Sequence, residues 1–320
     1  MDKQQTFYGS GMKKQRKILR AEVFLAEMNK VIPWDDLIST IKPYYKKKTG
    51  RQPWDIGLML RLHFLQIWYN LSDPALEEAV YDRLTFQNFL GFDCFGGDVP
   101  DESSICRFRH LLEQHNLSEK IFASVNNYLD KKGLVMKQGT IVDASLLSAP
   151  ISKKNKKKAR DPEMSSTKKN NKWHFGAKLH IGVQHQGKPL IHSLEVTTAK
   201  ESDKNHMTKL FHGEEKAIFG DSGYTHQEEK RGARHEGLYY GISDRGAHMH
   251  PLSASQKKRN RKLSSIRAKV EHPFAVIKNL WGQGRLKYKG LFKNKCRMQV
   301  TAALVNIFYC RKALGLVEAS

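Results

Sequence analysis

The stretch QGTIVDASLLSA, residues 138–149, marks the point at which the chain changes from helical to strand-forming in character. Thr, Ile and Val are β-branched, and a short apolar run of such residues predicts a buried strand. KWHFGAKLHIGVQ (172–184) alternates apolar and polar side chains, and KPLIHSLEVTTA (188–199) follows a turn at Gly187. These segments predict three consecutive strands.

The segments after them alternate between helix and strand. SDKNHMTKLF begins with a Ser-Asp cap and is typical of a helix, whereas KAIFGDSGY and LYYGISDRG have the composition of strands. Two further helices are expected to close the chain, and this order predicts an α/β fold with one mixed sheet. The predicted ranges are 202–211 for the first helix, 216–224 and 238–246 for the strands, and about 256–280 and 295–314 for the last two helices.

The N-terminal part of the chain has the pattern of a helical domain. PWDIGLMLRLHFLQIWYNL (53–71) has Pro in its first turn and apolar residues on more than one face, which predicts a buried helix. Shorter helices with polar caps are predicted at 72–84 and 100–115. Arg107 and Arg109 are expected to project from the second of these, as in a helix-turn-helix-like module that contacts DNA. A plain helical bundle is the alternative that the pattern leaves open.

The positive charge of the chain is concentrated in two segments. The net charge is +23 with a pI near 9.8, which predicts a polyanionic partner. Residues 1–150 carry a net charge of +2 and residues 173–255 are neutral, whereas 151–172 carry +7 and 256–320 carry +14. Such localised excess favours a docking surface for nucleic acid over a general aid to solubility.

The first basic segment, 150–172, has almost no apolar residues and is predicted to be a solvated, mobile loop between the first two strands. A basic linker without a task, or a nuclear-localisation-like string, is the alternative to contact with phosphates. The second basic segment begins the long helix. The side chains predicted to contact DNA are Lys153, Lys154, Lys156, Lys157 and Lys158 in the loop, Lys257, Lys258, Arg259 and Arg261 in the helix, and Arg107 and Arg109 in the N-terminal part.

Three acids are candidates for chemistry. Asp143 lies within the first predicted strand, Asp221 follows a later one, and open α/β sheets bind ligands around strand ends of this kind. Two neighbouring carboxylates repel each other unless a cation lies between them. Glu271 is the single acid among eight Lys and Arg residues between Gln256 and Lys278, and it would supply a third ligand.

Oxygen ligands of this type suit hard divalent ions, above all Mg²⁺. Arg267 and Lys278 lie four residues before and seven after Glu271, so all three are expected on one stripe of the helix. Two such ions about 3.5–4 Å apart activate water and stabilise a leaving 3′-oxygen. The lone acid is thus predicted to face metal while the surrounding cations face DNA.

Three motifs carry a resemblance to a known family. TIVDAS contains Asp143, GDSGY contains Asp221, and RAKVEHPFAVIK contains Arg267, Glu271 and Lys278. Together they resemble the bacterial insertion-sequence DDE transposases of the insertion-sequence-five group. Ser264 departs from that pattern, because related transposases often carry Tyr at this position.

The resemblance implies an RNase H-like catalytic domain over residues 133–320, preceded by an all-α domain over 1–132 that binds DNA ends, dimerises, or does both. It implies that Asp143, Asp221 and Glu271 bind two Mg²⁺ ions, with Mn²⁺ as a substitute, and that Arg267 and Lys278 contact the DNA ends. The enzyme would cleave the ends of its insertion sequence and join the 3′-OH ends to target DNA. A dimer or larger assembly on terminal inverted repeats, acting at the bacterial nucleoid in the cytoplasm, is expected.

Other readings of the sequence remain open. An RNase H-like nuclease without strand transfer, or a non-catalytic DNA-binding protein, would share many of these features. Asp244 ends a strand and would be a fourth acid, although a turn residue is the simpler interpretation. The four cysteines show no paired spacing, which predicts reduced thiols and no zinc site. No apolar run is long enough to span a bilayer, so no membrane partner is expected.

Overall fold

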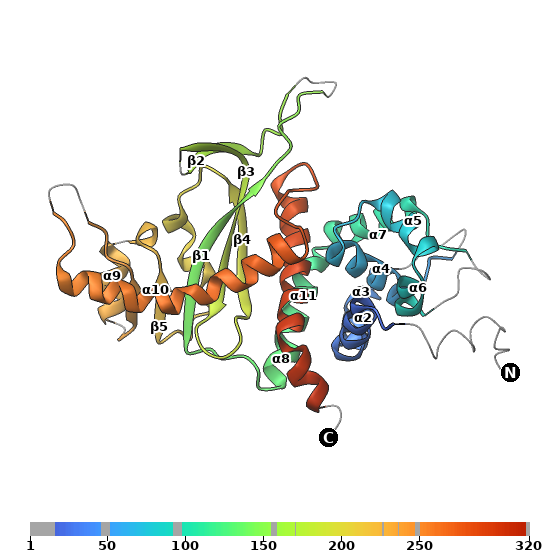
Figure 1. Ribbon diagram of the computed structural model, residues 1–320, viewed down its shortest axis with the longest axis horizontal. Helices are drawn as coiled ribbons and strands as arrows, with labels where there is room; N and C mark the ends of the chain where they lie inside the picture. The colour runs from blue at the N-terminus through green and yellow to red at the C-terminus, as the bar shows by residue number, and fades with distance from the viewer. Residues whose placement is uncertain are drawn as a thin grey trace.

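The computed structural model describes residues 17–45, 52–91, 98–154, 159–169, 171–225, 227–235, 237–246 and 250–317. One long helix, α11 (Leu291–Val317), runs through the middle of the molecule. A curled sheet lies on one side of α11, and the helices of the N-terminal part lie on the other (Figure 1).

The N-terminal part is helical, as predicted. Asp55, Ser72 and Asp101 each begin a helix by accepting a hydrogen bond from a backbone N–H of the first turn, which satisfies a donor that the helix itself leaves free. The predicted helix at 53–71 is confirmed as α4, and its residues are buried on all sides. The bounds are Arg20–Val31 for α2, Trp34–Ile41 for α3, Ile56–Trp68 for α4, Asp73–Asp82 for α5, Leu84–Leu90 for α6, Glu102–Gln114 for α7 and Leu117–Lys131 for α8.

The sheet has the strand order of an RNase H-like fold. Strand β3 pairs antiparallel with both β1 and β4, whereas β5 is parallel to β1 and β6 is parallel to β5. A three-stranded antiparallel unit followed by two parallel strands is the mixed sheet expected from the sequence. The bounds are Gly139–Ser148 for β1, Ser165–Lys169 for β2, Lys172–Gln184 for β3, Ile191–Thr198 for β4, Ala217–Gly220 for β5 and Tyr239–Ile242 for β6.

Two sequence predictions about local structure were wrong. The segment 150–172 was predicted to be a loop throughout, but β2 lies within it and pairs antiparallel with the start of β3. Its sequence, SSTKK, is polar because both strands protrude beyond the main sheet, so hydrophobicity gave no signal. The segment 202–211 was predicted to be one helix, but it forms two short 3₁₀ turns, η1 (Asp203–His206) and η2 (Thr208–Leu210).

A long helix crosses the sheet in front of β1 and β5. α10 (Ala254–Ala275) begins with a capping box in which Ser253 and Gln256 satisfy each other's backbone N–H groups. Pro273 lies near its end, and the helix then widens into a π-helical turn, η4 (Val276–Leu280). Proline removes one backbone donor, and π turns often occur at functional sites. The short helix α9 (Gln227–His235) connects β5 to β6.

One hydrophobic core joins the two halves of the chain. It contains buried residues of the N-terminal helices, of one sheet face and of α11, which packs against α2, α8 and β4. A smaller cluster, including Val142, Ile218 and Tyr224, covers the opposite sheet face. The boundary predicted between residues 132 and 133 therefore crosses a continuous core, and the division into domains stays a prediction. Within the described residues, no helix is long and apolar enough to cross a membrane.

The structure corrects the prediction for Arg109. Its side chain is buried, only 8% of the residue being exposed, and its guanidinium lies 2.6 Å from Asp73 and over the ring of Tyr288. Arg107, two positions earlier on α7, is exposed, because residues two apart point to nearly opposite sides of a helix. Arg109 is therefore a core ion-pair residue, and its guanidinium is not presented at the surface as a DNA contact would require.

These two arginines provide a matched test of the core. Arg109→Ala should lower the free energy of unfolding by about 3–5 kcal/mol, because it leaves the Asp73 carboxylate partly buried and unpaired. Arg107→Ala removes a solvent-exposed pair with Asp101 and an exposed hydrogen bond to Ser104, and should cost less than about 1 kcal/mol. Urea denaturation of both variants measures the difference, and equal losses would contradict this account of α7.

Candidate active site

Asp143 lies in the middle of β1, on the sheet face that α10 covers. It is opposite Ile181 of β3, and it shares its face with Ser145 and with Leu147 of the main core. The carboxylate accepts a 2.9 Å hydrogen bond from the N–H of Ala144. The side chain is half-buried, and burial is the largest cause that raises its pKa to about 6.

Asp221 stands at the same level on the neighbouring strand. Ile141 pairs with Phe219 in the parallel ladder, so Asp143 and Asp221 each follow that pair by two positions. The Asp221 carboxylate accepts a 2.8 Å hydrogen bond from the N–H of Gly223, which holds it at the start of the turn η3 (Ser222–Tyr224). The charge of Asp221 also raises the pKa of Asp143, as expected for adjacent carboxylates.

Glu271 reaches the same neighbourhood from α10, which contacts both β1 and β5. Its charge is a further cause of the raised pKa of Asp143. The side chain is exposed, and within the described part of the chain it forms no hydrogen bond or ion pair. The structure thus brings all three predicted acids into one electrostatic neighbourhood, with Glu271 left free to bind something else.

Two cations on the same helix side face the acids. Arg267, one turn before Glu271, is half-buried, and its positive charge lowers the pKa of Asp143. Lys278 donates 2.6 Å hydrogen bonds to the hydroxyl of Ser145 and to the carbonyl of Leu146. Burial is the largest cause that lowers the pKa of Lys278. Lys278 is therefore fixed beside Asp143 and Arg267 lies within electrostatic reach of it, where both would meet a phosphate bound to the acids.

The donor set suits a hard divalent ion in its chemistry. All three side chains offer carboxylate oxygens, and the mutual repulsion that raises the pKa of Asp143 is what a bound cation would relieve. Among the described residues, however, no group of three His, Cys, Asp or Glu side chains could hold a metal ion as they stand. Binding one shared ion therefore requires the three carboxylates to move closer together.

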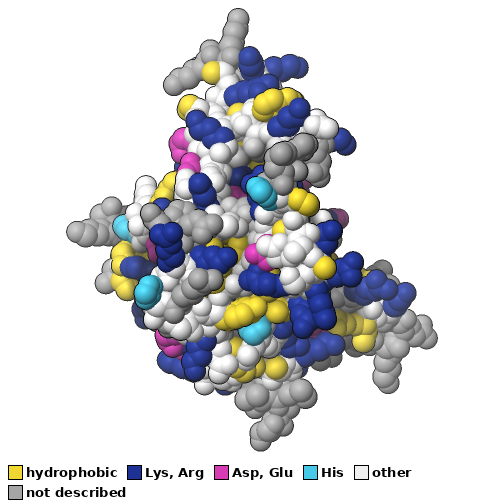
Figure 2. Space-filling view, turned by 90° about the vertical axis from the view of Figure 1, so that its left-hand side faces the viewer, with side chains coloured by type: hydrophobic (Ala, Val, Ile, Leu, Met, Phe, Trp, Pro, Cys, Tyr) yellow, Lys and Arg dark blue, Asp and Glu magenta, His cyan; other side chains and the backbone are white. Residues whose placement is uncertain are grey.

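The other predicted DNA contacts have different surroundings. Lys153, Lys154, Lys257, Lys258 and Arg261 are exposed, whereas Lys156, Lys157 and Lys158 lie outside the described residues. Figure 2 shows a face on which Lys and Arg side chains are widespread and Asp and Glu are few. This charge distribution fits an anionic partner.

The guanidinium of Arg259 makes its contacts within the protein. It donates hydrogen bonds to the carbonyls of Tyr240 and Ile242, at 2.8 and 3.0 Å, and forms a 2.9 Å ion pair with Asp244. Arg259 thus anchors α10 to the end of β6, and a DNA contact would have to break these bonds. The side-chain amide of Asn260 also donates a hydrogen bond to the backbone carbonyl of Asp244. Asp244 is therefore a structural residue at the end of a strand.

Tyr224, the last residue of the GDSGY motif, is a feature of the site that the sequence analysis missed. Its ring is fully buried beneath the sheet, and within the described residues its hydroxyl has no hydrogen-bond partner. Burial is the largest cause that raises the pKa of the Tyr224 hydroxyl. The negative charges of Asp143, Asp203 and Asp221 raise this pKa further. The position of Tyr224, three residues after the second acid in the same motif, was the available signal.

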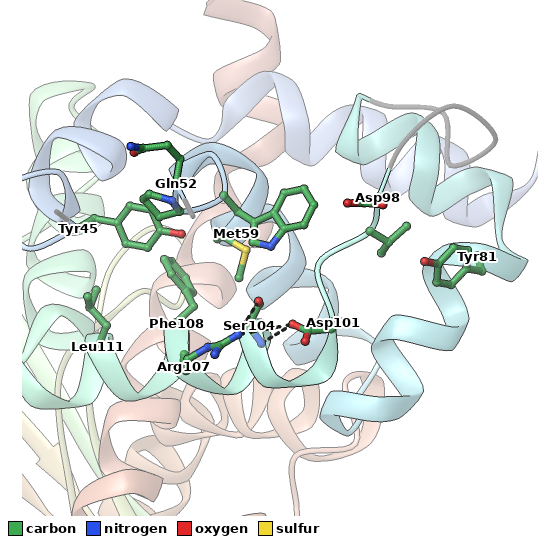
Figure 3. Close-up of a pocket in the computed structure, with 13 residues that line it drawn as sticks. Tyr45, Gln52, Met59, Tyr81, Asp98, Asp101, Ser104, Arg107, Phe108 and Leu111 are labelled. Atoms are coloured by element: carbon green, nitrogen blue, oxygen red, sulfur yellow. Dashed lines mark hydrogen bonds and ion pairs between the residues drawn. The ribbon is translucent and has the colours of Figure 1, made fainter. Parts of the chain in front are cut away.

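A separate cavity of about 650 Å³ opens in the N-terminal part. Aromatic side chains including Tyr45, Tyr81 and Phe108 line it, and Arg107 at its edge donates a hydrogen bond to Ser104 (Figure 3). The three acids do not line this cavity. The chemistry predicted for them therefore takes place elsewhere, on the sheet.

The strand order is that of an RNase H-like fold, and three acidic side chains from separate elements lie near one another on its sheet. A family model described as a transposase DDE domain matches residues 136–307, more than half of the chain, and the chain belongs to this family. A second model, described as a transposase domain (DUF772), matches residues 13–111. The chain is thus a DNA transposase, whose reaction is metal-dependent cleavage and strand transfer. The narrower insertion-sequence-five group stays a prediction.

Two solved structures resemble the chain at a distance. The first is a cryo-EM structure of the piggyBac transposase synaptic complex with hairpin DNA, at 10% identity and a TM-score of 0.48, over 93% of this chain and 76% of that one. The second is a crystal structure of the Mos1 strand transfer complex, at 12% identity and a TM-score of 0.20, over 76% and 82%. Neither likeness is close enough to assign a role to a residue.

The pKa of Asp143 predicts how its removal changes stability. Because that pKa is about 6 when folded, against about 3.9 when unfolded, the metal-free folded protein loses stability as pH rises between these values. Asp143→Asn should therefore match the wild type near pH 4 and exceed it by about 1–3 kcal/mol above pH 7. Urea denaturation in EDTA at both pH values checks this.

Glu271→Gln is the companion variant. It removes one of the charges that raise the pKa of Asp143, so it should give a smaller gain with the same pH dependence. A wild type as stable as Asp143→Asn at pH 7 would show that Asp143 is not under strain from its neighbours.

Proposed function

We propose that Asp143, Asp221 and Glu271 hold two Mg²⁺ ions, which Mn²⁺ would replace, and that DNA ends are cleaved and joined there. The observation that carries this proposal is the placement of three carboxylates: Asp143 and Asp221 stand at the same level of the parallel pair β1–β5, and α10, which carries Glu271, contacts both strands. Bound ions would activate water and stabilise the leaving 3′-oxygen. The side chains of the protein would orient the scissile phosphate at these ions.

Lys278 and Arg267 orient the scissile phosphate. Lys278 is held to β1 at Ser145 and Leu146, so its ammonium is pre-positioned two to three residues beyond Asp143. Ordering this cation before DNA arrives lowers the entropic cost of aligning the phosphate. Arg267 offers a second positive charge on the same side as Glu271, one helical turn away.

The reaction proposed at this site has two balanced steps. In hydrolysis, the oxygen of water bonds to the phosphorus, and the bond to the 3′-oxygen breaks, leaving a 5′-phosphate and a 3′-OH. In joining, that 3′-OH bonds to a phosphorus of target DNA, and the target's own 3′-oxygen leaves with a proton. One phosphodiester is broken as another is formed, so no nucleotide cofactor is needed.

The DNA partners proposed are the terminal inverted repeats of an insertion sequence and a target duplex. The exposed lysines of the 150–172 segment and of α10, together with a net charge of +23, support this proposal. Residues 1–132 would bind DNA ends or mediate dimerisation, and residues 133–320 would carry the chemistry. We place this activity at the nucleoid of a bacterial cell, in a dimer or larger assembly.

Strand joining tests the three acids. A duplex with a pre-cut 3′-OH end is incubated with a supercoiled plasmid and Mg²⁺, and joined product is measured on gels. Asp143→Asn, Asp221→Asn and Glu271→Gln should each abolish joining, because each removes a ligand, while DNA affinity stays within about twofold. Glu119→Gln, an exposed acid on α8, should join normally.

This assay also separates the alternatives. Joining that survives in any of the three variants would remove that residue from the catalytic set. Cleavage without joining by the wild type would indicate a nuclease, and DNA binding without either reaction would indicate a non-catalytic protein.

Salt dependence tests the two cations. Lys278→Ala and Arg267→Ala should each weaken DNA binding and reduce the slope of log affinity against log salt by about one, because each removes one phosphate contact. Lys278→Arg keeps the charge and should keep the slope. A slope unchanged in Lys278→Ala would mean that this ammonium does not reach a phosphate.

A further inference from the structure

An exposed tryptophan stands on the hairpin formed by β2 and β3. Trp173 is 72% exposed, although an indole ring is among the costliest side chains to leave in water. Within the described residues, no ring stacks on it and no cation covers it. Lone exposed apolar side chains are common on protein surfaces, so the surroundings of Trp173 decide whether it has a task.

Those surroundings are strongly basic. Lys168 lies directly opposite Trp173 in the β2–β3 ladder, and Lys169 pairs with Lys172. These three lysines are exposed and form no ion pair in the part of the chain that the structure describes. On the same strand face as Trp173, the guanidinium of Arg160 lies 5.1 Å from the ring centre of Phe175. The hairpin thus presents a free aromatic ring among unpaired cations.

The hairpin is an extension of the strand that carries the active site. Trp173 and Ile181 lie on the same face of β3, and Ile181 is opposite Asp143. At the end of β2, Lys169 is close enough for its charge to lower the pKa of Lys278. A duplex lying across the carboxylates would therefore meet this hairpin.

We propose that Trp173 stacks on an unpaired base of the bound DNA, while Lys168, Lys169 and Lys172 bind the phosphates on either side. The proposal rests on the proposed function and adds a second contact site to it. Aromatic rings among cations are the side-chain set that binds unpaired nucleotides without regard to sequence. A protein partner is disfavoured, because lysines are depleted at protein interfaces.

Fluorescence gives a direct readout of the ring. The full-length protein is titrated in EDTA with a 30-base-pair duplex and with the same duplex carrying a three-nucleotide gap. Subtracting the signal of Trp173→Phe from that of the wild type isolates the indole of Trp173. The gapped duplex should quench this component and protect it from acrylamide, and the intact duplex should do so less.

Affinity gives the second readout. Trp173→Ala should bind the gapped duplex about tenfold more weakly than the wild type, with a smaller loss on the intact duplex. Trp173→Phe keeps a stacking ring and should recover most of the affinity. Tyr239→Ala is the matched control, because Tyr239 is an exposed aromatic residue on β6, at the opposite end of the sheet. Thermal melts verify that all variants fold.

The outcomes separate the two proposals. A wild type that binds neither duplex would refute the proposed function itself. Normal DNA binding with an unquenched Trp173, or with Trp173→Ala as tight as the wild type, would overturn the stacking proposal alone. Loss of self-association in Trp173→Ala, with DNA affinity unchanged, would assign this face to a second copy of the chain and would equally overturn it.

Discussion

The convergence of carboxylates at the end of a parallel strand pair is the constraint on which the proposed site depends. Asp143 and Asp221 occupy equivalent positions on β1 and β5, and Glu271 is brought to them by α10. The net charge of the chain is +23, and among the described residues Arg267 and Lys278 are cations that interact electrostatically with Asp143. The acids are thus held together without being fully neutralised, which favours a site that receives divalent cations.

The fold can hold these acids close together because contacts outside the site fix the strands that carry them. The segment after η4 links the parts of the molecule: the Gln283 side chain donates to the carbonyl of Ile67, and the Asn70 side chain donates to that of Gly282. A bridge between Ser148 and Arg285 joins the same segment to the end of β1. The N-terminal helices, β1 and the turn that carries Lys278 are therefore joined through this one segment.

The sequence was sufficient for those features that are encoded by hydrophobic periodicity or by short motifs. The strands 138–149 and 172–184 and the buried helix at 53–71 follow from apolar patterns, and the structure places them within a few residues of the predicted ranges. The approach of three acids remote in sequence was predicted from their strand-end and helix positions together with the family motifs.

What the sequence did not reveal depends on which way single side chains point. Arg107 and Arg109 look alike in the sequence, but only the tertiary position of Asp73 makes one of them a core residue. Arg259 was likewise taken for a DNA contact, because its bonds go to carbonyls on a distant strand. Trp173 continues the alternation of β3, but its exposure follows from the position of its strand end beyond the core, which the alternation does not reveal.

The proposed mechanism requires that Asp143, Asp221 and Glu271 bind the same ions. Crystals of the protein grown with Mn²⁺ and DNA, measured at the manganese edge, would show the ions directly through their anomalous scattering. The expected result is manganese within bonding distance of the Asp143 and Asp221 carboxylates, with Glu271 turned in to complete the site. Manganese bound elsewhere, with Glu271 still in solvent, would contradict the account.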